Sequence, residues 1–362
     1  MKIAFFLPDL RPGGAERVNL DLAREFSFAG HDIQFVLAQA EGELLGEAEA
    51  LGSVVDLNCH RIRTTVGALS RYLKESQPDA LVVAMWPLTV IAPISVWISG
   101  HRCRVLVSEH AVLSLQYRKK SLAHKIFMRI SMMIGYRLAD ARVGVSSGVV
   151  RDIASLSRMR LSKFCVIYNP ISEPLMPDSG DIGRAMDVWG NAEVKILTVG
   201  NLKEEKNHKL LIGAFCRLGI DDSRLIILGK GMLKDQLQSL ANDLGVGDKV
   251  ILGGFVSDPT PFYMTADLFV LTSDHEGFGN VLVESLACGT PIVSTDCPYG
   301  PSEILEGGKY GSLVPRGDVE ALACAMAGAL DDSHDIGALK ERAQDFSPER
   351  SAHKYIDLLR KQ

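Results

Sequence analysis

Short apolar runs alternate with longer amphipathic stretches through most of the chain. Apolar runs bounded by turn residues are typical of buried strands, and a 3.6-residue period is typical of helices. In the first half this pattern predicts strands at Lys2–Leu7, Asp32–Ala38, Val54–Leu57, Ala80–Met85, Arg104–Ser108, Ala141–Ser146 and Phe164–Tyr168. The helices between them are expected at Ala15–Ala29, Val66–Glu75, Leu88–Ile98 and from Ser147. This alternation predicts an α/β fold with a parallel sheet.

The same alternation starts again after a proline-rich segment. Asn169–Gly183 contains three prolines, so we expect it to be an interdomain linker without regular structure. Strands are then predicted at Lys195–Gly200, Arg224–Leu228, Lys249–Leu252, Leu268–Leu271 and Pro291–Ser294, and helices at Leu233–Leu244, Asn280–Cys288 and Pro348–Leu359. A length of 362 residues favours two domains. We place them at 1–170 and 195–345, with a linker at 171–194 and a terminal helix at 346–362.

The composition favours a protein of the cytoplasm. Seven cysteines are scattered without a Cys-x-x-Cys pair, which argues against a disulfide framework and for a reducing compartment. Met1–Leu7 is too short an apolar run for a signal peptide, and we interpret it as a strand. Ala80–Ile98 has no charge over 19 residues and is long enough to cross a membrane. Because Pro87 and Pro93 interrupt it, we expect a buried strand followed by a buried helix.

Charge is unevenly distributed along the chain. Residues 1–170 carry 21 Lys and Arg against 15 Asp and Glu, whereas residues 171–362 carry 18 against 29. Ala111–Ala139 has no acidic residue and is predicted to be a basic amphipathic helix, a composition that docks on anionic lipid. Its basic residues are Arg118, Lys119, Lys120, Lys125, Arg129 and Arg137. The alternative is a helix that packs between domains and leaves its charges in solvent.

Asp274–Ile292, DHEGFGNVLVESLACGTPI, combines a glycine loop with two glutamates. Gly277 and Gly279 let the backbone approach a ligand closely. Asn280 is the expected N-cap of the following helix, and the amides at such a helix start attract negative charge. Glu276 lies before the helix and Glu284 lies inside it. A carboxylate on so apolar a helix needs a hydrogen-bonding partner, which a sugar could supply.

The segment EGFGNVLVESLACGTPIVSTDCPYGPSEIL resembles the two-glutamate signature of the family 4 retaining glycosyltransferases. The other landmarks of that family follow in order from Met1 to about Leu359. The resemblance implies the GT-B fold, in which two Rossmann-like domains with parallel sheets face each other across a cleft. In that family the last helix crosses back to the first domain.

The resemblance also implies a donor site. Glu276 would bind the donor sugar, Glu284 the ribose, and Lys206 the diphosphate. The family usually has Arg where this chain has Asn201, and Lys203 is a candidate replacement for that charge. The remaining donor-binding residues implied by the resemblance are Gly13, Gly14, Phe255, Val256, Gly277, Phe278, Gly279 and Asn280. Backbone groups around Phe255 would contact the base, which suits UDP, with GDP as the alternative nucleotide.

Three residues carry the implied catalysis, namely Glu276, His110 and Lys206. His110 would hydrogen-bond the sugar or the diphosphate, and Glu16, beside Arg17, could contact the acceptor. The implied reaction moves a hexose, N-acetylhexosamine or uronic acid from a UDP-sugar to a hydroxyl, with retention of configuration. The acceptor would be a lipid-linked, lipopolysaccharide or capsule saccharide at the inner face of the plasma membrane, reached through the basic helix.

No cofactor is expected, and the absence of Asp-x-Asp predicts that no metal is required. No nucleic-acid partner is expected. A nucleotide-sugar epimerase of the same architecture and a non-catalytic saccharide-binding scaffold remain alternatives. A dehydrogenase is disfavoured because G-x-G-x-x-G does not occur in the chain.

Overall fold

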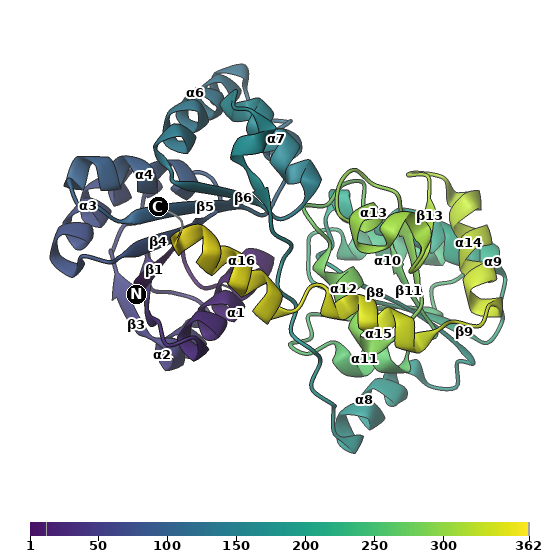
Figure 1. Ribbon diagram of the computed structural model, residues 1–362. Helices are drawn as coiled ribbons and strands as arrows, with labels where there is room; N and C mark the ends of the chain where they lie inside the picture. Colours follow the sequence, from purple (N-terminus) through teal and green to yellow (C-terminus); the bar gives the residue numbers. More distant parts are fainter. Residues whose placement is uncertain (12, 361–362) are drawn as a thin grey trace. The chain divides into compact units, whose positions relative to one another are not determined.

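The computed structural model describes residues 1–11 and 13–360, which form two compact units. Unit 1 comprises Met1–Ser172 with the described part of Phe346–Gln362, and unit 2 comprises Glu173–Asp345 (Figure 1). Each unit contains a parallel sheet flanked by helices. The predicted α/β class with two parallel sheets is confirmed.

The described strands of unit 1 form a seven-stranded sheet in the order β3-β2-β1-β4-β5-β6-β7. Their bounds are β1 Lys2–Leu7, β2 Asp32–Leu37, β3 Ser53–Asp56, β4 Ala80–Ala84, β5 Arg104–Glu109, β6 Ala141–Gly144 and β7 Cys165–Val166. Each neighbouring pair is parallel. The central strands are buried on both faces, which explains their continuous apolar runs.

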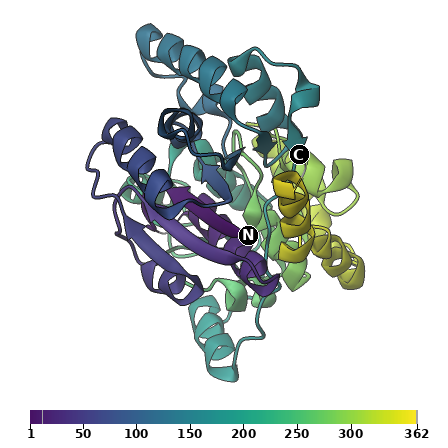
Figure 2. The ribbon, with the colours of Figure 1, turned by 60° about the vertical axis from the view of Figure 1, so that its left-hand side comes forward.

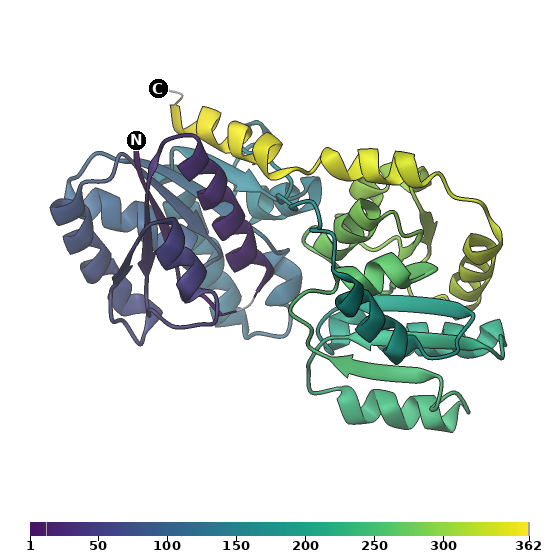
Figure 3. The same cartoon turned by 90° about the horizontal axis from the view of Figure 1, so that it is seen from below.

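Helices cover both faces of this sheet. Their bounds are α1 Gly14–Phe28, α2 Leu45–Leu51, α3 Thr65–Ser76, α4 Leu88–Ser99, α5 Leu113–Gln116, α6 Leu122–Leu138, α7 Ser147–Ser157 and α16 Pro348–Arg360. Phe5 of β1 faces the core formed with α1 and α16, whereas Phe6 faces the core formed with α3 and α4. The C-terminal helix α16 packs beside α1 in this unit (Figure 3). Its buried Tyr355 and Ile356 belong to the core of unit 1.

The described strands of unit 2 form a six-stranded sheet in the order β10-β9-β8-β11-β12-β13. Their bounds are β8 Val194–Val199, β9 Ser223–Leu228, β10 Val250–Gly254, β11 Leu268–Leu271, β12 Ile292–Thr295 and β13 Ser312–Val314. The helices are α8 Ser179–Trp189, α9 His208–Leu218, α10 Lys234–Asp243, α11 Thr260–Thr265, α12 Asn280–Cys288, α13 Pro301–Ile304, α14 Val319–Asp331 and α15 Ile336–Gln344. Apolar side chains of α9, α10 and α14 pack on one face of this sheet.

Two segments differ from their predicted structure. The prediction that Asn169–Gly183 lacks regular structure was wrong at its end, because α8 begins at Ser179. The last proline of the segment is Pro177, and Asp178 then caps the helix by accepting a hydrogen bond from the amide of Asp181 at 2.7 Å.

The basic segment is two helices rather than one. α5 ends at Gln116, and Ser121 caps α6 by accepting a hydrogen bond from the amide of His124 at 3.3 Å. The three consecutive basic residues Arg118–Lys120 therefore lie between the helices. The prediction that they lie on the face of one continuous helix was wrong.

The uncharged stretch Ala80–Ile98 forms β4 and most of α4, as the prolines predicted. None of the helices in residues 1–11 and 13–360 has the length and apolarity needed to span a bilayer.

Candidate functional site

The candidate site in unit 2 lies where the strand order of its sheet reverses. β8 is the central strand, with β9 on one side and β11 on the other. Ligands of open parallel sheets bind outside the carboxyl ends of the strands at such a reversal. The segment after β8 contains Asn201 and Lys206, and the segment after β11 contains Ser273 and Glu276. Two of the predicted catalytic residues therefore follow adjacent strands.

Lys206 and Glu276 form an ion pair between these two segments. Lys206 Nζ lies 2.5 Å from Glu276 Oε1, and the side chains are only 21% and 11% exposed. The Ser273 hydroxyl donates a second hydrogen bond to the same oxygen at 2.6 Å. A carboxylate this poorly hydrated is stable only when such donors compensate it. The residues predicted for diphosphate and sugar binding are thus in direct contact.

Further hydrogen bonds hold the two segments together around this pair. Thr272 Oγ1 donates to the carbonyl of Lys206 at 3.0 Å. Asn207 Nδ2 donates to Asp274 Oδ1 at 3.1 Å. Arg316, which follows β13, also holds the second segment, because its Nη1 donates to the carbonyl of Asp274 at 3.0 Å. These contacts hold the segment that carries Glu276, in addition to the contacts of the Glu276 side chain itself.

Glu284 lies inside α12 and is half-buried. Its Oε2 accepts a hydrogen bond from the hydroxyl of Tyr263 on α11 at 2.9 Å. Burial raises the pKa of Glu284, and the nearby Asp258 carboxylate raises it further. The hydrogen bond from Tyr263 lowers this pKa but does not outweigh burial. The sequence indicated that this carboxylate needs a partner but did not identify Tyr263, whose apolar surroundings make it resemble a core residue.

The start of α12 differs from the prediction. The N-cap is Gly279, in a left-handed conformation with φ 104°, and Asn280 is the first helical residue. Asn280 was therefore wrongly predicted as the cap, because glycine adopts this conformation more readily than asparagine. A Cβ atom on Gly300 would lie 1.8 Å from the carbonyl oxygen of Phe278, so this loop needs glycine at that position as well. Phe278 is 2% exposed, so its ring packs inside unit 2.

The loops after β8, β9 and β10 lie side by side at the same edge of the sheet. The amide of Gly229 donates to the carbonyl of Gly254 at 2.7 Å, and the amide of Leu202 donates to the carbonyl of Lys230 at 2.9 Å. These bonds place Asn201 near the loop that contains Lys230. Phe255 is 54% exposed, and Lys230 Nζ lies 5.2 Å from the centre of its ring. Val256 follows Phe255 in the same loop and is partly buried.

Unit 1 carries the other predicted residues at the carboxyl edge of its own sheet. Gly13 and Gly14 follow β1, where the strand order reverses between β1 and β4. Gly13 is the N-cap of α1, and a Cβ there would lie 2.2 Å from Glu16 Oε2. Burial raises the pKa of Glu16, which is partly buried against this loop.

His110 follows β5 and is a neutral imidazole near pH 7. Its Nε2 lies 3.2 Å from the Ser108 hydroxyl. Burial lowers the pKa of His110 to about 4. A neutral ring can both donate and accept a hydrogen bond, which suits contact with a sugar hydroxyl.

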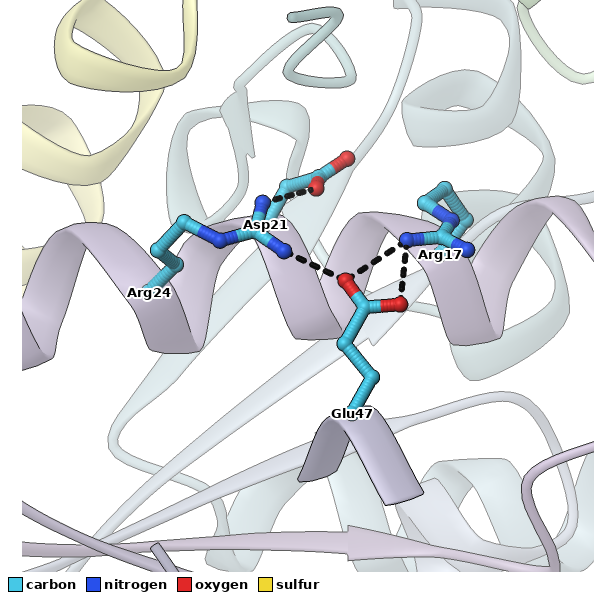
Figure 4. A network of polar contacts seen from close by, with 4 residues as sticks. All are labelled: Arg17, Asp21, Arg24 and Glu47. Carbon is cyan, nitrogen blue, oxygen red and sulfur yellow. Dashed lines mark hydrogen bonds and ion pairs between the residues drawn. The ribbon is translucent and has the colours of Figure 1, made fainter. Parts of the chain in front are cut away.

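Arg17 is part of a structural network on the outside of α1 (Figure 4). Its Nη1 lies 2.7 Å from Glu47 Oε2 on α2, and Arg24 pairs with Glu47 as well. Arg24 also contacts Asp21 at 3.0 Å. Burial raises the pKa of Asp21 to about 6, while Arg24 opposes that change. This network ties α2 to α1, so the Arg17 side chain serves the packing of unit 1.

Two family models match consecutive halves of the chain. The model for Glycosyltransferase Family 4 matches residues 12–173, and the model for Glycosyl transferases group 1 matches residues 186–347. The chain belongs to the family 4 glycosyltransferases. This confirms the resemblance that the glycine loop and its two glutamates indicated.

Two curated relatives of this chain are glycosyltransferases. One is the N-acetylgalactosamine-N,N'-diacetylbacillosaminyl-diphospho-undecaprenol 4-alpha-N-acetylgalactosaminyltransferase of Campylobacter jejuni, 32% identical over 68% of this chain and 65% of the relative. Another is the lipopolysaccharide core biosynthesis glycosyltransferase LpsE of Rhizobium meliloti, 38% identical over 62% of this chain and 65% of the relative. The chain thus spans about 65% of the length of both relatives.

Among solved structures, the glycosyltransferase is similar to Anabaena HepE, which was crystallised in complex with UDP. The TM-score is 0.84, the identity is 22%, and 99% of each chain is covered. At this identity the likeness shows the fold, and it confirms the predicted GT-B class.

Glu109 is a buried acidic residue whose role the sequence did not indicate. Its side chain is 1% exposed, and its Oε1 accepts hydrogen bonds from Thr89 Oγ1 at 2.6 Å and from the Tyr136 hydroxyl at 2.7 Å. The amide of Trp86 donates to Oε2 at 3.2 Å. Glu109 therefore connects the start of α4 and the end of α6 to the strand that ends beside His110.

The stability of the protein should depend on pH through Glu109. Burial raises the pKa of this carboxyl from 4.5 to about 7. The folded protein then binds the proton more tightly than the unfolded chain, so the contribution of Glu109 is fully present below pH 4.5 and is lost as the pH rises through 7. We expect the free energy of unfolding of wild type, relative to Glu109→Gln, to fall by on the order of 2 kcal/mol between pH 5 and pH 8.

Urea unfolding of both proteins at these two pH values measures the effect. The opposing change expected from the lowered pKa of His110 occurs in both proteins and cancels in the difference. An identical pH dependence of wild type and Glu109→Gln would contradict this account.

Proposed function

We propose that this chain is a retaining glycosyltransferase that moves a sugar from a UDP-sugar to a hydroxyl group of a lipid-linked or lipopolysaccharide saccharide. The observation that carries the proposal is the contact of Lys206 with Glu276 at the strand reversal of unit 2. The relatives support the acceptor class, since the name of one describes a diphospho-undecaprenol saccharide and that of the other a lipopolysaccharide core. The UDP complex of the similar HepE structure supports the choice of nucleotide.

In the proposed complex each side chain of the unit 2 site contacts one part of the donor. Glu276 accepts hydrogen bonds from hydroxyls of a hexose, N-acetylhexosamine or uronic acid. Glu284 accepts from the ribose diol, a charge-assisted arrangement. Lys206 binds the diphosphate, and amides of the loop Gly277–Gly279 contribute further donors. Backbone groups near the exposed Phe255 contact the base.

The proposed step forms a bond between the acceptor oxygen and the anomeric carbon while the bond from that carbon to the β-phosphate oxygen breaks. Attack occurs on the face from which UDP leaves, so configuration is retained. The acceptor proton passes to the leaving phosphate oxygen, and UDP departs. The protein contributes positioning and charge stabilisation, with Lys206 opposing the negative charge that accumulates on the phosphate.

The proposal assigns the charge of the leaving group to Lys206 and backbone amides, without a divalent metal. The chain has no Asp-x-Asp pair to bind a metal–diphosphate complex. Asn201 replaces the family arginine, so the lysine carries a larger share of the charge here than in relatives that keep both cations.

A membrane-facing surface on unit 1 is part of the proposal. α6 packs against α4 and α7 at the edge of the unit (Figures 1 and 2). Its inner flank carries the buried Met128 and Met132. The outer flank carries apolar side chains that are between 41% and 72% exposed. They are Leu122, Ile126, Phe127, Ile130, Ile134 and Leu138.

Positive charge surrounds this apolar flank. Arg129 and Arg137 are exposed on the same helix, and the turn before it contains Arg118, Lys119 and Lys120. Exposed apolar patches of this kind mark interaction sites. Apolar side chains combined with basic residues fit the headgroup region of an anionic bilayer, where each basic residue contributes about 1 kcal/mol. We assign this surface to docking on the membrane that carries the acceptor lipid.

Transfer should depend on the two glutamates in different ways. Glu276→Ala should abolish UDP release from a UDP-sugar in the presence of membrane extract, because the sugar loses its main contact. Glu284→Ala should chiefly weaken UDP affinity, by about tenfold or more for a lost charged hydrogen bond. A UDP-release assay across UDP-sugars, with calorimetry for UDP, measures both effects. Wild-type turnover by Glu276→Ala would contradict the proposal.

The same assay in the presence of EDTA tests the role given to Lys206. Turnover is expected to be unchanged, since no divalent metal takes part in the proposed step. Strong metal dependence would contradict this assignment.

Flotation with liposomes tests the membrane surface. The wild-type protein should float with anionic liposomes, and Phe127→Ser should bind them about thirtyfold more weakly, because roughly 2 kcal/mol of apolar transfer is lost. Phe28→Ser is the matched control, since Phe28 is a 77% exposed phenylalanine on α1 of the same unit. Equal binding by both variants, or self-association through α6 without lipid binding, would contradict the assignment.

A further inference from the structure

Two donors converge on a single oxygen of Glu276. Lys206 Nζ and the Ser273 hydroxyl both contact Oε1, at 2.5 Å and 2.6 Å. With Oε1 held in this way, the carboxylate plane cannot rotate freely, and Oε2 is the oxygen left to meet a sugar hydroxyl. Rotation about this bond is otherwise broad, because the last torsion of a glutamate has no sharp minima.

The two donors differ in what a bound nucleotide does to them. An ammonium has no fixed geometry and is attracted by a diphosphate, whose charge exceeds that of one carboxylate. Binding of a nucleotide diphosphate therefore draws Lys206 toward the phosphates and weakens its contact with Glu276. The Ser273 hydroxyl is uncharged, so the diphosphate does not compete for it to the same degree.

The backbone fixes the place of Ser273. Its side chain follows β11 and is fully buried. Thr295 Oγ1, at the end of β12, donates to the carbonyl of Ser273 at 2.7 Å. Ser273 is thus held between two adjacent strands of the sheet, three residues before Glu276, and its hydroxyl cannot follow a moving ligand.

We infer that Ser273 is a positioning residue, which keeps the Glu276 carboxylate aimed at the donor sugar after the diphosphate has engaged Lys206. This inference rests on the proposed transferase function and deepens it. Ser273 contacts neither nucleotide nor sugar in this account. Its removal should therefore affect the sugar-dependent step and leave nucleotide binding intact.

Ser273→Ala separates these two effects. With the UDP-sugar that gives wild-type turnover, kcat should fall about tenfold or more, the cost of one hydrogen bond to a charged group. The affinity for UDP, measured by calorimetry, should stay within about twofold of wild type, because UDP lacks the sugar that Glu276 contacts. Ser273→Thr, which keeps the hydroxyl, should recover most of the lost kcat.

Ser285→Ala is the matched control. Ser285 is also a fully buried serine in unit 2, but its hydroxyl donates to the carbonyl of Thr290 at 3.1 Å, away from Glu276. It should lower thermal stability as much as Ser273→Ala does and leave kcat unchanged. Unchanged kcat in Ser273→Ala, or equal losses of kcat and of UDP affinity, would overturn the inference. Absence of turnover in the wild type with every UDP-sugar would instead refute the proposed function itself.

Discussion

The unit 2 site depends on keeping one carboxylate charged where water hardly reaches it. Glu276 is 11% exposed at the edge of a parallel sheet, and an isolated carboxylate in such a place would be costly. Lys206 and Ser273 compensate the charge, and the same contacts join the segments after β8 and β11. The chemistry proposed for the site and the local structure of the sheet edge therefore have a common origin.

A related arrangement occurs in unit 1, with a different balance of donors. Glu109 is buried with hydroxyl and amide donors, and burial raises its pKa to about 7 although these hydrogen bonds oppose the change. These donors come from α4, from α6 and from the chain before α4, so Glu109 helps to hold the apolar helix α6 against the strand that precedes His110. Glu109 therefore contacts α6, which carries the proposed membrane surface, and it also ends the strand that precedes His110.

Most of the fold could be predicted from the sequence because strands and helices alternate with clear apolar periodicity. β11 and α12 have the predicted bounds, since both are short elements between strong turn signals. The predicted helix starts were wrong where a single residue determines the backbone conformation. Gly279 rather than Asn280 caps α12, and Ser121 starts α6 within a segment whose composition suggested one helix.

The candidate site was predictable only as a set of residue types. Family resemblance identified Lys206 and Glu276, but the two are 70 residues apart, and their contact depends on the order of the strands. Tyr263 and Ser273 gave no signal at all, because a tyrosine in an apolar helix and a serine after a strand are common in any buried core. The sequence pattern does not show which residues far apart in the chain come into contact.

Calorimetric titration of UDP into wild type, Lys206→Ala and Lys209→Ala tests the central claim most directly. Lys209 is an exposed lysine in the first turn of α9 and serves as the control for loss of positive charge near the site. We predict that Lys206→Ala binds UDP about tenfold or more weakly than wild type, while Lys209→Ala stays within about twofold. Equal UDP affinity in wild type and Lys206→Ala would contradict the account.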